Sequence, residues 1–171
     1  MFKKGIIEKI NVLQIRLSSL SFHPLQVKYQ PQLCTFFTRS ADSDHHDSLF
    51  GDNGNDVLLG GTGNDTLKGG TGNDFIAGGS GHDVLWGGTH ADTFYFDGAS
   101  GHDVIKDFNH RGQGDKLQID DSLATNIGQI STWQNGANLE LYFKASGDVI
   151  GQITLENFSS SQYGDDMFQF V

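Results

Sequence analysis

Aspartate recurs at a fixed spacing of nine residues through the centre of this 171-residue chain. Five nine-residue units follow one another without a gap from Gly51, and each begins with glycine and carries Asp at its sixth position. A degenerate unit from Asp42 keeps this aspartate, and a further unit from Gly98, shifted by two residues, restores it. The sixth-position residues are Asp47, Asp56, Asp65, Asp74, Asp83, Asp92 and Asp103. Such regular carboxylates predict a row of equivalent cation sites.

Calcium binding is the chemistry expected of this pattern. Glycine at positions one, two and four lets the backbone turn sharply and frees carbonyl groups to point at a ligand. Carboxylate and carbonyl oxygens together supply a shell of six or more oxygen ligands, which Ca²⁺ prefers and Zn²⁺ does not. The carbonyls expected to take part are those of Gly51, Asn53, Gly60, Thr62, Gly69, Thr71, Gly78, Ser80, Gly87 and Thr89.

Each unit divides into a turn of six residues and a strand of three. In a short strand the middle side chain faces opposite to its neighbours, so position eight should point into a shared interior. Position eight is large and apolar throughout, with mixed residues on either side of it. The predicted interior residues are Leu58, Leu67, Ile76, Leu85, Phe94 and Ile105. The sequence therefore predicts an all-β fold.

Two units complete one coil, and this decides which aspartates become neighbours. Parallel strands of successive coils lie about 4.8 Å apart, so aspartates two units apart should stack. One column is predicted to contain Asp47, Asp65, Asp83 and Asp103, and the other Asp56, Asp74 and Asp92. Asp115 lies outside the repeats and is assigned to neither column. Columns of carboxylates repel strongly unless cations neutralise them.

The composition excludes several other classes of protein. The chain has 23 Gly, 2 Pro and 36% hydrophobic residues, which argues against a helical bundle. Its net charge of −10 disfavours nucleic acid as a partner and favours cations. The single cysteine, Cys34, allows no internal disulfide, so calcium would have to act as the staple.

The first 41 residues differ from the rest. Residues 1–40 hold six Lys and Arg against one Glu, a net charge of +5, which leaves −15 on residues 41–171. We expect 1–41 to be a basic, poorly ordered extension and assign it no function. No transmembrane segment and no N-terminal signal peptide are expected, because charged residues interrupt every apolar stretch.

The unit GGxGxD followed by x-apolar-x resembles the repeat-in-toxin (RTX) calcium-binding nonapeptide. This resemblance implies a parallel β-roll, a calcium-stapled β-helix, over residues 42–106. Residues 91–121 carry an ADTF run, a D-x-I-x-D-F run and a D-K-L strand, and are similar to the C-terminal domain of serralysin-type (M10) proteases. That similarity implies calcium ligands at Asp103 and Asp107.

Residues 107–171 are predicted to form a C-terminal β cap that covers the last rung of the coil. Alternating apolar residues predict antiparallel strands, with an Asn135-Gly136 hairpin turn between 129–133 and 139–143. The strand residues are Leu117 and Ile119, then Leu139, Leu141 and Phe143, then Ile150, Ile153 and Leu155.

The C-terminus ends with Asp165 and Asp166 before a nearly apolar run. It resembles the uncleaved signal of type I secretion substrates. The alternative is a last edge strand that packs Met167, Phe168 and Phe170, and the two readings are compatible because a signal read while unfolded can pack after export.

Known catalytic motifs are absent. No H-E-x-x-H occurs, neither Ser80 nor Ser100 lies in G-x-S-x-G, and no P-loop lysine follows the glycines. Adjacent His45 and His46 are expected to be solvated rather than to bind a transition metal. We therefore expect no enzyme activity.

The predicted function is a calcium-binding module that folds after secretion and serves the folding and export of an extracellular protein. Its expected partners are calcium ions, the type I secretion apparatus, and either an upstream catalytic domain or a polysaccharide. Two alternatives stay open: an accessory polysaccharide-binding module of the alginate type, and the C-terminal remnant of a serralysin-like metalloprotease. For the former, Trp86, Trp133, Tyr142 and Tyr163 form a candidate sugar-stacking platform, although such aromatics also serve as core residues.

Overall fold

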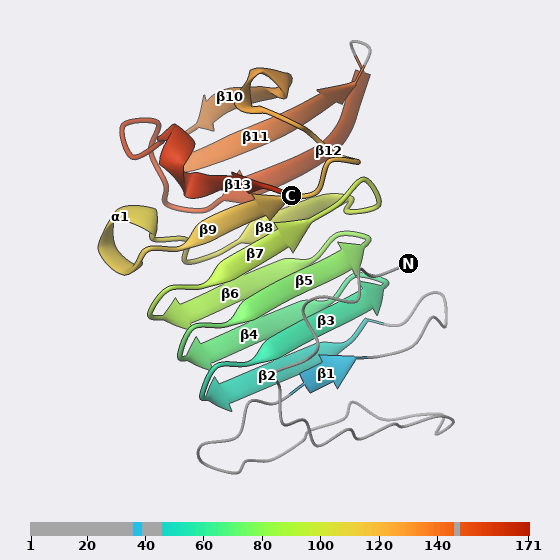
Figure 1. Cartoon of the computed structure of the whole chain (residues 1–171), viewed down its shortest axis with the longest axis vertical. Helices are drawn as coiled ribbons and strands as arrows, with labels where there is room; N and C mark the ends of the chain where they lie inside the picture. Colours follow the sequence, from blue (N-terminus) through green and yellow to red (C-terminus); the bar gives the residue numbers. More distant parts are fainter. Residues whose placement is uncertain (1–35, 39–45, 146–147) are drawn as a thin grey trace.

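A computed structural model describes residues 36–38, 46–145 and 148–171. Its strands form two sheets that face each other along the long axis (Figure 1). Sheet A runs in the order β1 (Phe36–Thr38), β3 (Val57–Thr62), β5 (Phe75–Ser80), β7 (Thr93–Phe96), β9 (Lys116–Ile119), β13 (Phe168–Phe170). Sheet B runs in the order β10 (Ile130–Asn135), β11 (Asn138–Ala145), β12 (Asp148–Leu155), β8 (His102–Ile105), β6 (Val84–Thr89), β4 (Thr66–Thr71), β2 (Ser48–Asn53).

The repeats coil as predicted, because successive strands alternate between the two sheets. β3 pairs in parallel with β5, with Val57 opposite Phe75, and β4 pairs in the same way with β6, with Thr66 opposite Val84. Each partner is 18 residues away, which is two repeats. The spacing grows to 20 residues between β6 and β8, where the two-residue shift occurs. The predicted parallel β-roll is therefore confirmed.

The strands are longer than the three residues predicted for each repeat. β3 through β6 each contain six residues, because each strand continues through the first three positions of the following repeat, of which the second and third pair with the neighbouring coil. The glycine pair thus lies within the ladder, and the turn proper is shorter than expected. The physical reason is that backbone pairing requires no side chain, so glycines can continue a parallel ladder.

The core lies between the two sheets. All six predicted interior residues, at position eight, are fully buried, while positions seven and nine of the repeats are half-buried. In the cap, Leu139, Leu141 and Phe143 of β11 continue this core together with Ile153 and Leu155 of β12. Burial of such side chains contributes about 1.5–3 kcal/mol each, so this interior is the main apolar contribution to stability.

The cap is partly antiparallel. β10 and β11 form the predicted hairpin, with Gly136 at φ +62° in its turn, and β12 lies antiparallel to β11. The prediction was wrong for Leu117 and Ile119, because β9 runs parallel to both β7 and β13. Apolar alternation marks a strand but carries no information on its direction, which the connections decide. β12 joins the cap to the roll by parallel pairing with β8.

Short helices complete the fold. α1 (His110–Gln113) interrupts the turn between β8 and β9, and 3-10 helices occupy Ile127–Gln129 and Asp165–Met167. Among the described residues, no helix has the length and apolar character needed to cross a membrane. The predicted basic extension lies outside the described residues except for Phe36–Thr38, which form β1 and pair with β3.

Candidate metal centre

The sixth-position aspartates form the two predicted columns, one along each edge of the roll. On one edge, the backbone N–H of Asp65 donates to Oδ1 of Asp83 at 2.7 Å, and that of Asp83 to Oδ1 of Asp103 at 2.9 Å. Asp47 begins this column by donating to Asp65 at 2.8 Å. Each carboxylate is therefore held by the backbone of the preceding coil.

The second column has one member more than predicted. Asp56 donates to Asp74 at 2.8 Å, Asp74 to Asp92 at 2.9 Å, and Asp92 to Asp115 at 3.0 Å. Asp115 is 2% exposed and lies outside the nonapeptide repeats, as the sequence indicated, but its place at the end of this column was not predicted. The ninefold spacing fails here because α1 lengthens the turn, but Asp115 is still followed two residues later by a core residue, Leu117. That local pattern was the signal available in the sequence.

One oxygen of most of these carboxylates has no protein partner. Oδ2 of Asp65, Asp74, Asp83, Asp92 and Asp103 is buried without a hydrogen bond, although Oδ1 of each accepts an N–H. These residues are 1–2% exposed. A buried carboxylate oxygen without a donor is costly, and in a native structure such an oxygen commonly binds an ion or an ordered water.

Burial has a strong effect on the charge state of these groups in the metal-free fold. Burial, followed by neighbouring aspartates, raises the pKa of Asp65 and Asp74 to about 6 and that of Asp92 and Asp103 to about 7. Burial also raises the pKa of Asp83. Backbone N–H groups oppose each shift but do not cancel it. A cation bound at these oxygens would favour the charged carboxylates and so would oppose these shifts.

The first-position glycines let an aspartate oxygen and a carbonyl oxygen lie close to the backbone, and we call this group of atoms a glycine cradle. A Cβ atom built on Gly69 would lie 2.3 Å from Oδ2 of Asp74 and 2.6 Å from the carbonyl oxygen of Gly87. A Cβ on Gly60 would lie 2.5 Å from Oδ2 of Asp65 and 2.4 Å from the carbonyl oxygen of Gly78. Such distances are far too short for a carbon atom, so only a residue without a Cβ fits at this position. The repeat therefore keeps glycine where a side chain would fill the cradle.

The structure brings only part of the predicted carbonyl set to these cradles. The carbonyls of Gly69, Gly78 and Gly87 each border the glycine of the preceding coil. Those at position three have another role, since Thr71, Ser80 and Thr89 accept N–H groups from Gly54, Gly63 and Gly72. A carbonyl has a second lone pair, so these oxygens can still contribute. Gly51, Asn53, Gly60 and Thr62 remain predicted ligands only.

Asp107 occupies a different environment from the other predicted ligands. Its two carboxylate oxygens accept the N–H groups of Gly87 and Gly88, at 2.9 and 3.0 Å. Its role as a ligand stays a prediction. In the described part of the chain, no three side chains of His, Cys, Asp or Glu converge into a metal site. Sites that combine one or two carboxylates with backbone carbonyls fit both observations, and they suit a hard cation rather than zinc.

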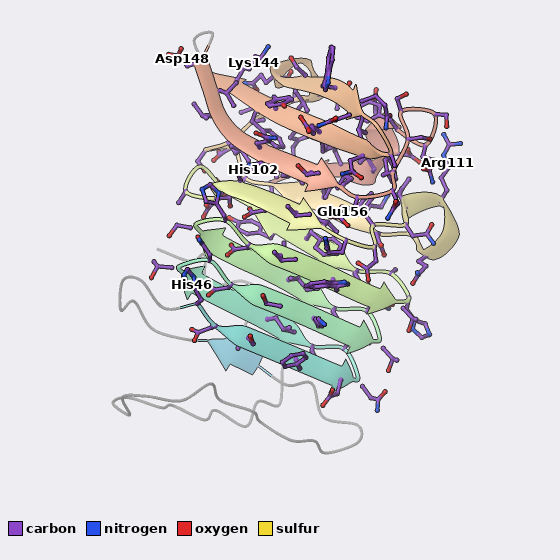
Figure 2. The ribbon with its side chains drawn as sticks, turned by 180° about the vertical axis from the view of Figure 1, so that it is seen from behind. His46, His102, Arg111, Lys144, Asp148 and Glu156 are labelled. Atoms are coloured by element: carbon purple, nitrogen blue, oxygen red, sulfur yellow. The ribbon has the colours of Figure 1, made fainter. Side chains whose placement is uncertain are left out.

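Figure 2 shows the roll from behind, with His46 near one end and Asp148 at the far tip of the cap. The ring of His46 bonds the backbone of Asn64 at 3.0 Å, while His45 lies outside the described residues. His46 thus contacts the backbone of the neighbouring coil.

The fold and the stacked carboxylates define a calcium-binding parallel β-roll. Residues 43–76 and 68–105 match the family model of the RTX calcium-binding nonapeptide repeat (4 copies). This segment of the chain consists of RTX repeats, which bind calcium. A search of curated proteins found no significant match.

Solved structures with the same fold include two modules of one enzyme and part of another. The AlgE6R3 subunit of the Azotobacter vinelandii mannuronan C5-epimerase is 28% identical with a TM-score of 0.62, over 77% of this chain and 82% of that one. The AlgE6R2 subunit is 26% identical with a TM-score of 0.52, over 72% and 92%. The extracellular lipase LipA of Serratia marcescens is 28% identical with a TM-score of 0.52, over 71% of this chain but only 20% of the lipase.

Proposed function

We propose that this chain is a module that stays unfolded where calcium is scarce and folds into its β-roll on binding calcium outside the cell. The observation that carries the proposal is the ladder of buried aspartate oxygens without protein donors. Calcium bound beside the first-position glycines would provide the positive partner that these aspartate oxygens lack within the protein. Because the ligands come together only on folding, binding and folding would be one event.

The magnitudes support this coupling. An unsatisfied buried polar group costs about 1–3 kcal/mol, and more when it is charged. The five aspartates Asp65, Asp74, Asp83, Asp92 and Asp103 each present one such oxygen. Their combined cost is at least about 5–15 kcal/mol by that figure, which equals the whole stability of a typical domain. A metal-free roll with ionised carboxylates is therefore not expected to persist at neutral pH.

Small-angle scattering tests this proposal through chain dimensions. A folded chain of this length has a radius of gyration of about 16 Å and an unfolded one about 44 Å. We expect a value near the larger figure in EGTA and a contraction when calcium reaches about 10⁻⁴–10⁻³ M, the range of extracellular calcium modules. Equal dimensions with and without calcium would contradict the proposal.

We further propose export by a type I secretion apparatus that reads the C-terminal segment 165–171. In the folded chain, Met167 and Phe168 are buried and β13 pairs with β9, so this segment would be readable only before folding. Asp166 is also held, because His110 Nε2 lies 3.0 Å from its Oδ2 and Lys116 donates to its carbonyl oxygen. A calcium-poor cytosol would keep the segment accessible.

A polysaccharide-binding role is the second candidate, favoured by one arrangement on the outer face of the cap. Trp133 is 66% exposed and lies opposite Glu140 in the hairpin. Asn135 Nδ2 donates to one oxygen of Glu140 at 2.7 Å, and the hydroxyl of Tyr142 donates to the other. An exposed ring beside an oriented carboxylate suits a sugar, whose apolar face stacks while its hydroxyls donate.

The remaining aromatics of the predicted platform lie elsewhere. Trp86 is on β6, three strands beyond β11 in sheet B, and Lys68 Nζ lies 4.5 Å from its ring centroid. Tyr163 packs on Phe168 at 5.8 Å. Titration with oligosaccharides, including mannuronan, should quench the fluorescence of Trp133 if this second role is correct. A Trp133→Ala variant that gives the same response would exclude it.

An accompanying catalytic domain is consistent with the comparisons. The two AlgE6 modules belong to an epimerase and the LipA region to a lipase, while RTX repeats themselves are calcium-binding modules rather than catalytic sites. We propose that this chain serves an enzyme in the same way and does not itself catalyse a reaction.

A further inference from the structure

The outer face of the cap carries a tryptophan that lies outside the apolar core. Trp133 belongs to β10, the edge strand of sheet B, and is 66% exposed. Alternate residues of a strand share a face, so Ser131 and Asn135 lie on the same side of β10 as this ring. A large aromatic ring contributes binding energy when a partner covers it. The ring of Trp133 is therefore available to a ligand.

A fixed carboxylate lies beside this ring. Glu140 of β11 is directly opposite Trp133, and side chains in such antiparallel pairs have Cβ atoms about 4.5–5.5 Å apart. Asn135 and Tyr142 each donate to one of its two oxygens. These bonds hold the carboxylate in one orientation. Each oxygen has room for a further donor, so a ligand N–H can bind without displacing either bond.

The carboxylate of Glu140 is ionised near neutral pH. Hydrogen bonds from Tyr142 first, and then from Asn135, lower its pKa. Both donors are neutral groups, so they fix the charge without cancelling it. Burial, followed by the neighbouring His82, lowers the pKa of His102, the histidine that interacts with Glu140. The ring of His102 is therefore uncharged near neutral pH.

Lysines in the described part of the chain do not offset this charge at short range. Lys106 is held in an ion pair with Glu156. Lys144 lies four residues beyond Glu140 on β11, about 13 Å along the strand, and Figure 2 shows it near Asp148 at the tip of the cap. The chain also carries an excess of acidic residues. The face therefore repels anionic ligands and attracts cationic ones.

An exposed ring beside a fixed carboxylate fits a sugar that carries a protonated amine. A pyranose ring with equatorial substituents presents axial C–H groups, and these stack on an indole ring. A protonated amine on the same sugar donates a charge-assisted hydrogen bond to a carboxylate, which is stronger than a neutral one. A uronate would instead bring a second carboxylate to Glu140.

We infer that the outer face of the cap binds a saccharide with a protonated amine, with the sugar ring on Trp133 and the amine at Glu140. The inference rests on the second role proposed above, polysaccharide binding, and it narrows that role because it makes uronates weak ligands. β-linked glucosamine has both the equatorial substituents and the amine. A basic peptide offers the same charge, but its long side chains lose more conformational entropy on binding than a rigid sugar ring.

Calorimetry of the full chain at saturating calcium tests the inference with three oligosaccharides of equal length. They are β-linked glucosamine, its N-acetylated form and mannuronate. We expect the glucosamine oligomer to bind about fivefold more tightly than the N-acetylated one, the upper range for an exposed ion pair, and mannuronate to bind most weakly. Equal affinity for the first two, or tightest binding of mannuronate, would overturn the inference but not the saccharide role. Binding of none of the three would refute both.

Glu140→Gln keeps the shape of the side chain and removes its charge, so it should abolish the preference for glucosamine over its N-acetylated form. Asp148→Asn is the matched control, because it removes one negative charge from the tip of the same cap and should keep that preference. Trp133→Ala should weaken the binding of both oligomers. A preference that survives Glu140→Gln would overturn the inference. Tighter binding of oligoarginine than of the glucosamine oligomer, if it depends on Trp133, would overturn it in favour of a basic protein segment.

Discussion

At the scale of single residues, each repeat combines a glycine at its first position with an aspartate at its sixth position. The first-position glycine makes room in its own repeat for Oδ2 of the sixth-position aspartate, as in Gly69 and Asp74. The conformational preferences of glycine and aspartate do not by themselves explain why the two residues recur together in every repeat. Together they bring a carboxylate oxygen and a backbone carbonyl oxygen close to one point of the chain, and calcium prefers oxygen ligands of both kinds.

Asp74→Ala should raise the calcium concentration at the folding midpoint far more than Asp148→Ala. Asp74 is buried mid-column, where its Oδ1 accepts the N–H of Asp56 and its Oδ2 borders the Gly69 cradle. Asp148 is exposed at the tip of the cap (Figure 2). Circular dichroism during calcium titration measures both midpoints. Equal midpoints would contradict the stacked-site account.

Gly69→Ala should destabilise the calcium-loaded roll by about 1–3 kcal/mol or more, the cost of overpacking a filled site. Its methyl group would lie 2.3 Å from Oδ2 of Asp74 and 2.6 Å from backbone oxygen. Gly98→Ala is the control, because Gly98 is exposed and its nearest contact is 3.2 Å. Urea unfolding at saturating calcium compares the two variants. An equal loss of stability in Gly69→Ala and Gly98→Ala would contradict this prediction.

At the scale of elements, the repeats were predictable and their ends were not. The apolar residue at position eight and the aspartate at position six recur every nine residues. This regular spacing predicts the register in which β3 through β6 pair. The last turn breaks that phase, since α1 adds residues between Asp103 and Asp115. Its placement depends on backbone donors that the sequence pattern does not reveal. The parallel direction of β9 was missed for a similar reason, because it depends on the connection and not on alternation.

Deleting residues 165–171 should trap the protein in a cell that carries a matching type I exporter, while deleting residues 1–40 should not. The deletion removes β13 and the buried Met167, so a folding effect must be separated from an export effect. Assays of cell and medium fractions make that separation. A truncated chain that still reaches the medium, with only a poorer response to calcium, would show that 165–171 is an edge strand rather than a signal.

At the scale of the whole molecule, the excess of acid makes stability depend on both calcium and protons. Residues 41–171 carry a net charge of −15. Such a chain repels itself in compact form unless cations or protons neutralise it. Folding is thereby tied to the composition of the surroundings rather than to apolar burial alone.

Lowering the pH from about 7.5 to about 5.5 should weaken calcium binding and increase the number of protons released per ion bound. Burial raises the pKa of Asp65 and Asp74 to about 6 and that of Asp92 and Asp103 to about 7 in the metal-free fold, above the ordinary value of 3.8. The metal-free fold therefore gains from protonation a stability that is complete below pH 3.8 and is lost as pH rises through 6–7. Calorimetry in buffers of different ionisation enthalpy counts the protons. An equal calcium concentration at the binding midpoint at both pH values would contradict the raised pKa values of these aspartates.

Far-UV circular dichroism of the full chain in excess EGTA, followed by calcium titration at neutral pH, tests the central claim most directly. The stacked, donor-poor carboxylates predict a disordered spectrum in EGTA and a cooperative change to a β-rich spectrum near 10⁻⁴–10⁻³ M calcium. Magnesium at the same concentration should have a much smaller effect, because it demands a stricter octahedral geometry. A β-rich spectrum that persists in EGTA would contradict the claim, since it would show that the columns are stable without metal.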